Sequence, residues 1–156
     1  MDTSFTSLQQ ILRTAIQREI EANALYNRAA EIVTAPEARD LLRDLALQEL
    51  GHRHRLEALL AGNLWVALSE AQARKAQDLK ITDYLIEVPL TAEASIQDIL
   101  IVAGKREAGS HALYAGLAQV AEVDEARRLF EFLAAEERMH KQRIETLYER
   151  LFYAEN

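Results

Sequence analysis

Cysteine is absent from the 156-residue sequence, and proline, glycine and aromatic residues are scarce. The lack of cysteine excludes disulfides, thiolate catalysis, iron–sulfur clusters and other iron centres held by cysteine within the chain. Only 2 prolines and 5 glycines are available to interrupt a helix, whereas alanine, leucine, glutamate and arginine are abundant. This composition strongly favours α-helix.

The sequence also lacks an excess of positive charge and a long apolar run. Its net charge is −7 and its isoelectric point is near 5.2, so its surface repels phosphate backbones and we expect no nucleic-acid binding. No apolar run approaches the ~18 residues that a membrane span needs. Residues 1–17 contain no basic region followed by an apolar stretch, so we expect no secretory signal and a cytoplasmic location.

Four long helical segments account for most of the chain, which we interpret as a single domain over residues 1–156. In the first segment apolar residues recur at spacings of three and four, as they do on one face of a helix. Pro36 suits the first turn of the second helix, Gly62 suits its C-cap, and Ser95 with Asp98 predicts a capping box at the start of the third. The expected helices cover about residues 6–34, 36–61, 95–121 and 123–152.

A long connection, residues 62–94, separates the two helical pairs. We expect a short helix near Ser69–Gln77 and an extended piece that ends at Pro89. Such a length is explained if the second and third helices run parallel, because the chain must then cross the whole bundle. The connection has more apolar residues than a solvated linker needs, so we expect it to cover the bundle or to pair subunits in a homodimer or higher homo-oligomer. These residues are Leu64, Trp65, Ile81, Tyr84, Leu85 and Ile86.

The two helical pairs are copies of one hairpin. The differences 107 − 19, 114 − 26, 137 − 49 and 140 − 52 all equal 88, and each joins two residues of the same type. The pairs are Glu19 with Glu107, Tyr26 with Tyr114, Glu49 with Glu137, and His52 with His140. One offset that aligns four pairs indicates an internal duplication.

The glutamates and histidines of both copies are expected to meet in the middle of the bundle. Glu19 and Glu49 are equidistant from the break at residue 34, and Glu107 and Glu137 are equidistant from the break at residue 122. Each pair therefore lies at the same height, ~22 Å from its turn at 1.5 Å per residue. The Glu-x-x-His spacing places His52 one turn from Glu49 on the same face, and the second copy repeats this arrangement.

Four buried carboxylates repel one another unless cations neutralise them. Two divalent metals would balance the four charges, and mixed carboxylate and imidazole ligation suits iron or manganese, with zinc also compatible. The pattern thus predicts a site for two metal ions. The alternative interpretation, in which these are ordinary solvated glutamates of surface helices, does not account for the offset that the glutamates and histidines share.

This constellation resembles the ferritin-like di-iron carboxylate proteins, and among them the rubrerythrin-like group, over about Leu8 to Leu151. The resemblance implies an all-α, ferritin-like four-helix bundle with a long crossover between its second and third helices. It also implies that Tyr26 and Tyr114 donate hydrogen bonds to the ligands. The implied ligands are Glu49 and Glu137 as bridges, Glu19 and Glu107 as terminal carboxylates, and His52 and His140, one on each metal.

Two features depart from the rubrerythrin pattern. Those proteins usually carry an additional glutamate three residues after the third-helix ligand, where this chain has Ser110, and usually a rubredoxin domain, which requires cysteine. The resemblance implies redox chemistry of two iron ions with hydrogen peroxide or dioxygen, as in defence against oxidative stress. An external donor would supply the electrons. The alternatives are iron oxidation for storage or transfer, and a non-catalytic bundle that metal supports.

A few residues near the motifs allow two readings. His111 follows Glu107 by four residues and could touch the site, although its counterpart in the first copy is Asn23. His54 lies off the ligand face and is expected to be solvated. Gly104 and the other glycines of the third helix indicate close helix packing, or else space for a small oxidant.

Overall fold

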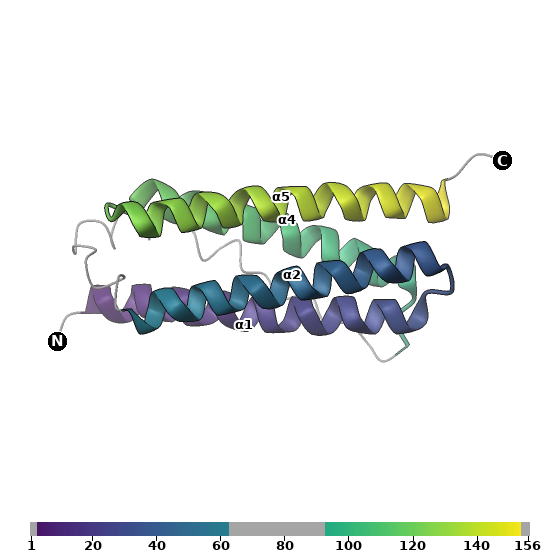
Figure 1. The fold of residues 1–156 in the computed structure, drawn as a ribbon, viewed down its shortest axis with the longest axis horizontal. Coiled ribbons are helices and arrows are strands. Elements are labelled where there is room, and N and C mark those ends of the chain that lie inside the picture. Colours follow the sequence, from purple (N-terminus) through teal and green to yellow (C-terminus); the bar gives the residue numbers. More distant parts are fainter. Residues whose placement is uncertain (1–2, 63–92, 154–156) are drawn as a thin grey trace.

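The computed structural model describes residues 3–62 and 93–153 of the chain. Within these ranges there are four α-helices and no strand, so the predicted all-α, ferritin-like four-helix bundle is confirmed (Figure 1). The helices are α1 (Thr3–Ile32), α2 (Pro36–Ala61), α4 (Ile96–Val120) and α5 (Asp124–Phe152).

The helix ends follow from local sequence. Pro36 opens α2, and the residue before it, Ala35, is extended, as expected for a residue that precedes proline. Helix α1 therefore ends at Ile32, slightly before the expected Thr34. At the start of α4, the Ser95 hydroxyl accepts a hydrogen bond from the Asp98 backbone N–H at 3.2 Å, and the Asp98 carboxylate accepts one from the Ser95 N–H at 3.4 Å. The predicted capping box is therefore present.

Each half of the chain forms an antiparallel hairpin, α1 with α2 and α4 with α5, and α2 runs parallel to α4 (Figure 1). The apolar core is divided into two clusters along the bundle. One cluster joins the start of α1 and the end of α2 to the end of α4 and the start of α5, through Leu12, Leu56, Leu117 and Leu133. The other lies at the opposite end and contains Val33, Leu42, Ile99 and Leu147. The level between the clusters is the level at which the sequence places its glutamates and histidines.

The predictions for the connection lie outside the described residues. They concern the helix near Ser69–Gln77, the extended piece ending at Pro89, and the apolar residues proposed to cover the bundle or pair subunits. In the described part of the chain, none of the helices combines the length and apolar character that crossing a membrane requires.

Candidate metal centre

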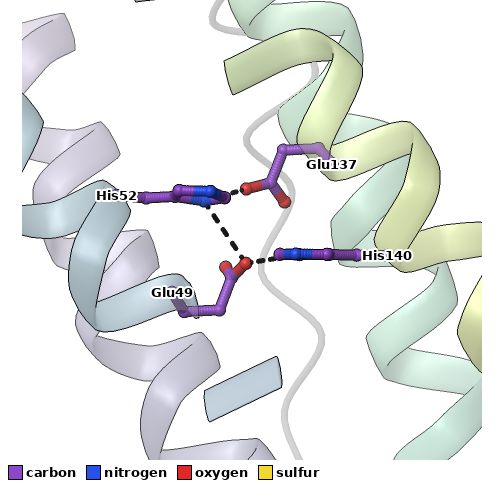
Figure 2. A group of neighbouring side chains, drawn as sticks. All are labelled: Glu49, His52, Glu137 and His140. Carbon is purple, nitrogen blue, oxygen red and sulfur yellow. Dashed lines mark hydrogen bonds and ion pairs between the residues drawn. The ribbon is translucent and has the colours of Figure 1, made fainter. Parts of the chain in front are cut away.

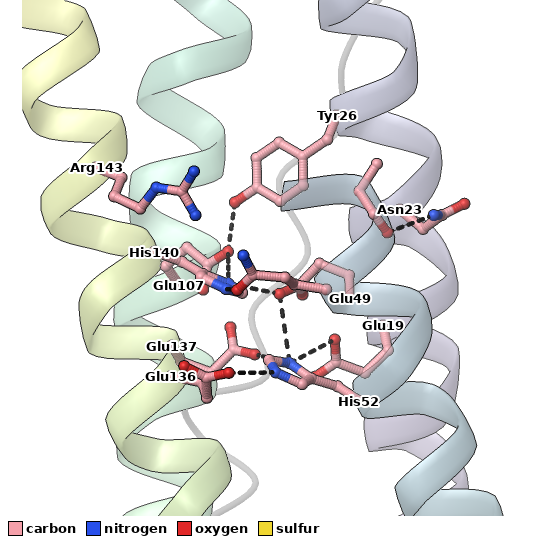
Figure 3. A network of polar contacts seen from close by, with 12 residues as sticks. Glu19, Asn23, Tyr26, Glu49, His52, Glu107, Glu136, Glu137, His140 and Arg143 are labelled. Atoms are coloured by element: carbon pink, nitrogen blue, oxygen red, sulfur yellow. Dashed lines mark hydrogen bonds and ion pairs between the residues drawn. The ribbon is translucent and has the colours of Figure 1, made fainter. Parts of the chain in front are cut away.

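Six ionisable side chains converge at the middle of the bundle, one or two from each helix (Figure 3). Each is at most 2% exposed. Helix α1 contributes Glu19, α2 contributes Glu49 and His52, α4 contributes Glu107, and α5 contributes Glu137 and His140. The structure therefore brings together all six residues that the sequence singled out.

The two Glu-x-x-His motifs form the centre of this cluster. One atom from each of the four side chains lies within 4.8 Å of the others (Figure 2). Nδ1 of His52 is 2.8 Å from Oε1 of Glu137, and Nδ1 of His140 is 2.7 Å from Oε1 of Glu49. Each histidine thus contacts the glutamate of the opposite hairpin, so the duplication in sequence becomes an approximate two-fold symmetry in space.

The same approximate two-fold symmetry relates the hydrogen bonds of the two tyrosines. The Tyr114 hydroxyl donates to Oε1 of Glu19 at 2.6 Å, and the Tyr26 hydroxyl donates to Oε1 of Glu107. Burial, followed by the nearby glutamate charges, raises the pKa of both phenols well above the usual value. Both tyrosines are therefore neutral hydrogen-bond donors. Each orients the carboxylate outside the Glu-x-x-His motif of the other hairpin, which is Glu19 for Tyr114 and Glu107 for Tyr26.

Burial also changes the protonation of the carboxylates. It raises the pKa of Glu19 and of Glu137, and the neighbouring charge of Glu49 raises both further. Burial acts in the same direction on Glu49, but its close contacts with the imidazoles of His140 and His52 outweigh burial and hold its pKa below the usual range. Without a cation, Glu49 therefore ionises more readily than Glu19 and Glu137, which keep their protons to a higher pH than ordinary glutamates do.

His140 carries a matching shift. Burial lowers its pKa, but the carboxylates of Glu107 and Glu49 outweigh burial and raise the pKa to about 9. Protons therefore take the place that cations would occupy among these carboxylates.

The donor set fits two divalent metal ions. Within the described part of the chain, two inward carboxylate oxygens are buried without a hydrogen-bond partner, and each such atom costs about 1–3 kcal/mol unless something binds it. They are Oε2 of Glu19 and Oε2 of Glu107, whereas Oε1 of Glu49 and Nδ1 of His140 face each other at 2.7 Å. Four carboxylates with two imidazoles supply the charge and the ligand types that iron, manganese or zinc accept.

His111 does not join the cluster. Its Nδ1–H donates to the Ala134 carbonyl at 2.7 Å, and its counterpart Asn23 donates to the Ala46 carbonyl at the same distance. Both bonds tie the two helices of a hairpin together three residues before the motif glutamate. His54 is exposed, as expected.

Of the two interpretations of Gly104, close helix packing is not supported by the described residues around it. A Cβ added there would meet no described atom within 4 Å, because this residue lines an open groove between α4 and α5 with Leu100 and Tyr148. A Cβ added at Gly51, inside the first motif, would likewise meet nothing within 4 Å in the part of the chain that the structure describes.

Sequence reasoning missed Gln48 and Glu136, which precede the motif glutamates. Oε1 of Gln48 is 2.7 Å from Nε2 of His140, and Oε1 of Glu136 is 3.9 Å from Nε2 of His52. The 88-residue offset relates these two positions as well, since 136 − 48 is 88. Their difference in residue type concealed the relation.

The comparison with protein families agrees with this geometry. The Rubrerythrin family model matches residues 2–60 and 98–156, which are most of the two hairpins. Neither a curated protein nor a solved structure matches the chain at a significant level.

Proposed function

Because the chain belongs to the rubrerythrin family, we propose that it carries out redox chemistry with hydrogen peroxide or dioxygen at a centre of two iron ions. The observation that carries the proposal is the cluster of four glutamates and two histidines, buried at mid-bundle between two apolar clusters. Such a cluster is costly to bury unless cations occupy it.

The geometry suggests a role for each ligand. Glu49 and Glu137 face each other from α2 and α5, and in our proposal they would serve as ligands to both ions. Glu19 and Glu107 each bind one ion, and His52 and His140 complete the two halves.

The rest of the chain positions these ligands and excludes water. Tyr114 and Tyr26 fix the orientation of Glu19 and Glu107 by hydrogen bonds. The apolar clusters on either side keep bulk water from the site, so charges within it interact strongly. When bound, two ferrous ions supply the two electrons that reduce hydrogen peroxide, with two protons, to two molecules of water, and an external donor restores those electrons.

Anaerobic titration with ferrous iron, followed by addition of oxidant, tests the proposal. Binding should saturate near two equivalents, because each hairpin supplies two glutamates and one histidine. Hydrogen peroxide should then oxidise the iron stoichiometrically, with continued turnover only when a reductant is present. Saturation at one equivalent would contradict the two-metal centre, and rapid oxidation by dioxygen with growth of a mineral core would favour iron storage.

A further inference from the structure

The outer nitrogen of each imidazole faces equivalent positions that hold different residues. Nε2 of His140 is 2.7 Å from the amide oxygen of Gln48. Nε2 of His52, by contrast, is 3.9 Å from the carboxylate of Glu136 (Figure 3). The contacts cross between the hairpins in both cases. At this point the two-fold symmetry places a neutral acceptor against one histidine and a carboxylate against the other.

A chain of hydrogen bonds fixes the orientation of Gln48. Its amide nitrogen donates to Oδ2 of Asp44 at 2.8 Å, and the same oxygen accepts from Arg143 at 2.9 Å. The oxygen of Gln48 must therefore be the atom that faces His140. Nε2 of His140 therefore carries a hydrogen, and Nδ1, which points towards the carboxylates, is the nitrogen that would bind a metal after it releases its own proton.

The other half replaces this hydrogen-bond chain with an apolar contact. The residues equivalent to Asp44 and Arg143 are Phe132 and Arg55, because 132 − 44 and 143 − 55 both equal 88. The Arg55 guanidinium lies 4.7 Å above the centroid of the Phe132 ring, a cation–π contact. Glu136 therefore has no counterpart of Asp44 at the equivalent position to orient it.

Nε2 of His52 nevertheless needs a hydrogen-bond partner at this position. The histidine side chain is 3% exposed, and Nε2 is buried without a hydrogen-bond partner among residues 3–62 and 93–153. Glu136 is 24% exposed, and a hydrogen bond to His52 requires its carboxylate to move closer than the present 3.9 Å. It would then accept a charge-assisted hydrogen bond, which is shorter and stronger than the bond to a neutral amide.

We propose that Glu136 and Gln48 make the two metal positions unequal, so that the metal bound by His52 is held more tightly than the metal bound by His140. This inference rests on the proposed two-metal centre. A carboxylate that accepts the outer N–H of an imidazole makes the inner nitrogen a stronger ligand than a neutral amide does. Glu136 is thus a positioning residue that acts through His52.

Two sets of substitutions make the halves alike. Glu136→Gln gives both histidines an amide. Gln48→Glu gives both a carboxylate, and it is combined with Asp44→Asn so that no second carboxylate opposes the new charge. Outer partners of metal-bound histidines change affinity by about 10–100-fold. We therefore expect Glu136→Gln to weaken the tighter step by about tenfold, and the Gln48 variant to strengthen the weaker step similarly.

Cobalt(II) titration, followed by calorimetry and by the visible d–d absorption, measures both steps without any turnover. Parallel titrations in His140→Ala and His52→Ala backgrounds assign each effect to one half. Glu136→Gln should weaken binding when only His52 remains and leave it unchanged when only His140 remains. If one of these backgrounds binds no cobalt, the comparison uses the proteins that keep both histidines. Their two successive cobalt affinities then show whether Glu136→Gln weakens the tighter step. Melting of the chelator-treated variants checks that the fold is intact.

The outcomes separate this inference from the proposed centre. Two bound cobalt ions whose affinities do not respond to Glu136→Gln, or respond equally in both backgrounds, would overturn the inequality alone. Absence of specific cobalt binding by the unmodified protein would overturn the metal centre itself.

Discussion

At the residue scale, the two buried tyrosines link the hairpins through the carboxylates. Tyr26 and Tyr114 are each 1% exposed, and each reaches across to the outer glutamate of the other copy. Loss of either hydroxyl leaves a buried carboxylate oxygen without its donor. Because the contacts are equivalent, their removal should have equivalent effects.

Replacing Tyr114 by Phe should lower the free energy of unfolding by about 1–3 kcal/mol, the cost of one unsatisfied buried acceptor. Tyr26→Phe should lower it by a similar amount, since it breaks the equivalent bond to Glu107. Urea denaturation of both variants under the same metal conditions measures the two effects. A large effect of one substitution and none of the other would show that the two-fold symmetry does not extend to these contacts.

Glu137 should be required for stabilisation by iron. Metal at a thousand times its dissociation constant adds about 4 kcal/mol per independent site, because unfolding scatters the ligands. Glu137→Ala should lose most of this gain, since the proposed bridge contacts both ions. Melting temperatures with ferrous iron and with chelator give the gain for each protein.

Glu131→Ala provides the matched control for Glu137→Ala, because Glu131 is exposed on the same helix. It should retain the full response to iron. If iron stabilises Glu137→Ala as much as it stabilises the control, Glu137 is not a ligand.

At the element scale, the sequence determines the height of the ligands because helices have a fixed rise. Glu19 and Glu49 lie equally far from their turn, and the second hairpin repeats the distance. Pro36 and the Ser95 capping box define helix starts by local chemistry alone. These features were therefore predictable before any contact between hairpins was known.

Contacts between hairpins were not predictable in the same way. The pairing of Gln48 with His140 depends on how the hairpins rotate against each other, which no local pattern specifies. His111 shows a related difficulty, because its distance from Glu107 allows either a ligand or a tie to Ala134. Only the packed helices distinguish the two.

Gly104 gives a prediction about α4. Glycine in a helix interior is about 1 kcal/mol less favourable than alanine, and a Cβ at this position would meet no atom of the described helices within 4 Å. Gly104→Ala should therefore raise the free energy of unfolding by roughly 0.5–1 kcal/mol. Ala108→Gly, at an exposed position on the same helix, should lower it comparably. Destabilisation by Gly104→Ala in urea denaturation would mean that another part of the chain covers this groove.

At the scale of the whole molecule, the bundle consists of two apolar clusters with a polar level between them. The clusters provide the hydrophobic stabilisation, and the polar level opposes it unless its charges are neutralised. Stability and metal content should therefore be coupled. When metal is removed, bound protons neutralise part of the buried negative charge. The link between stability and metal content therefore depends on pH.

The chelator-treated protein should lose stability as the pH rises from about 6.5 to about 9. His140 contributes because its pKa is raised from 6.5 to about 9: burial opposes this shift, but Glu107 and Glu49 outweigh it. The folded state then binds a proton that the unfolded chain releases, so the contribution is complete below the unfolded pKa and is lost as the pH rises through the folded one. The loss from this group is on the order of 3 kcal/mol.

Other groups of the cluster have known signs in the same experiment. The pKa values of Glu19 and Glu137 are raised by burial and by neighbouring carboxylates, so their contributions also fall as the pH rises. The pKa of Glu49 is lowered, so its contribution to stability is lost only in acid.

Protein saturated with ferrous iron should behave differently. Metal replaces the protons, and it binds more strongly as the ligands deprotonate, so the free energy of unfolding should stay constant or rise over the same pH range. Anaerobic urea denaturation between pH 6.5 and 9 gives both curves. Parallel curves would show that iron and protons do not compete for this cluster, because competition requires the two curves to diverge as the pH rises.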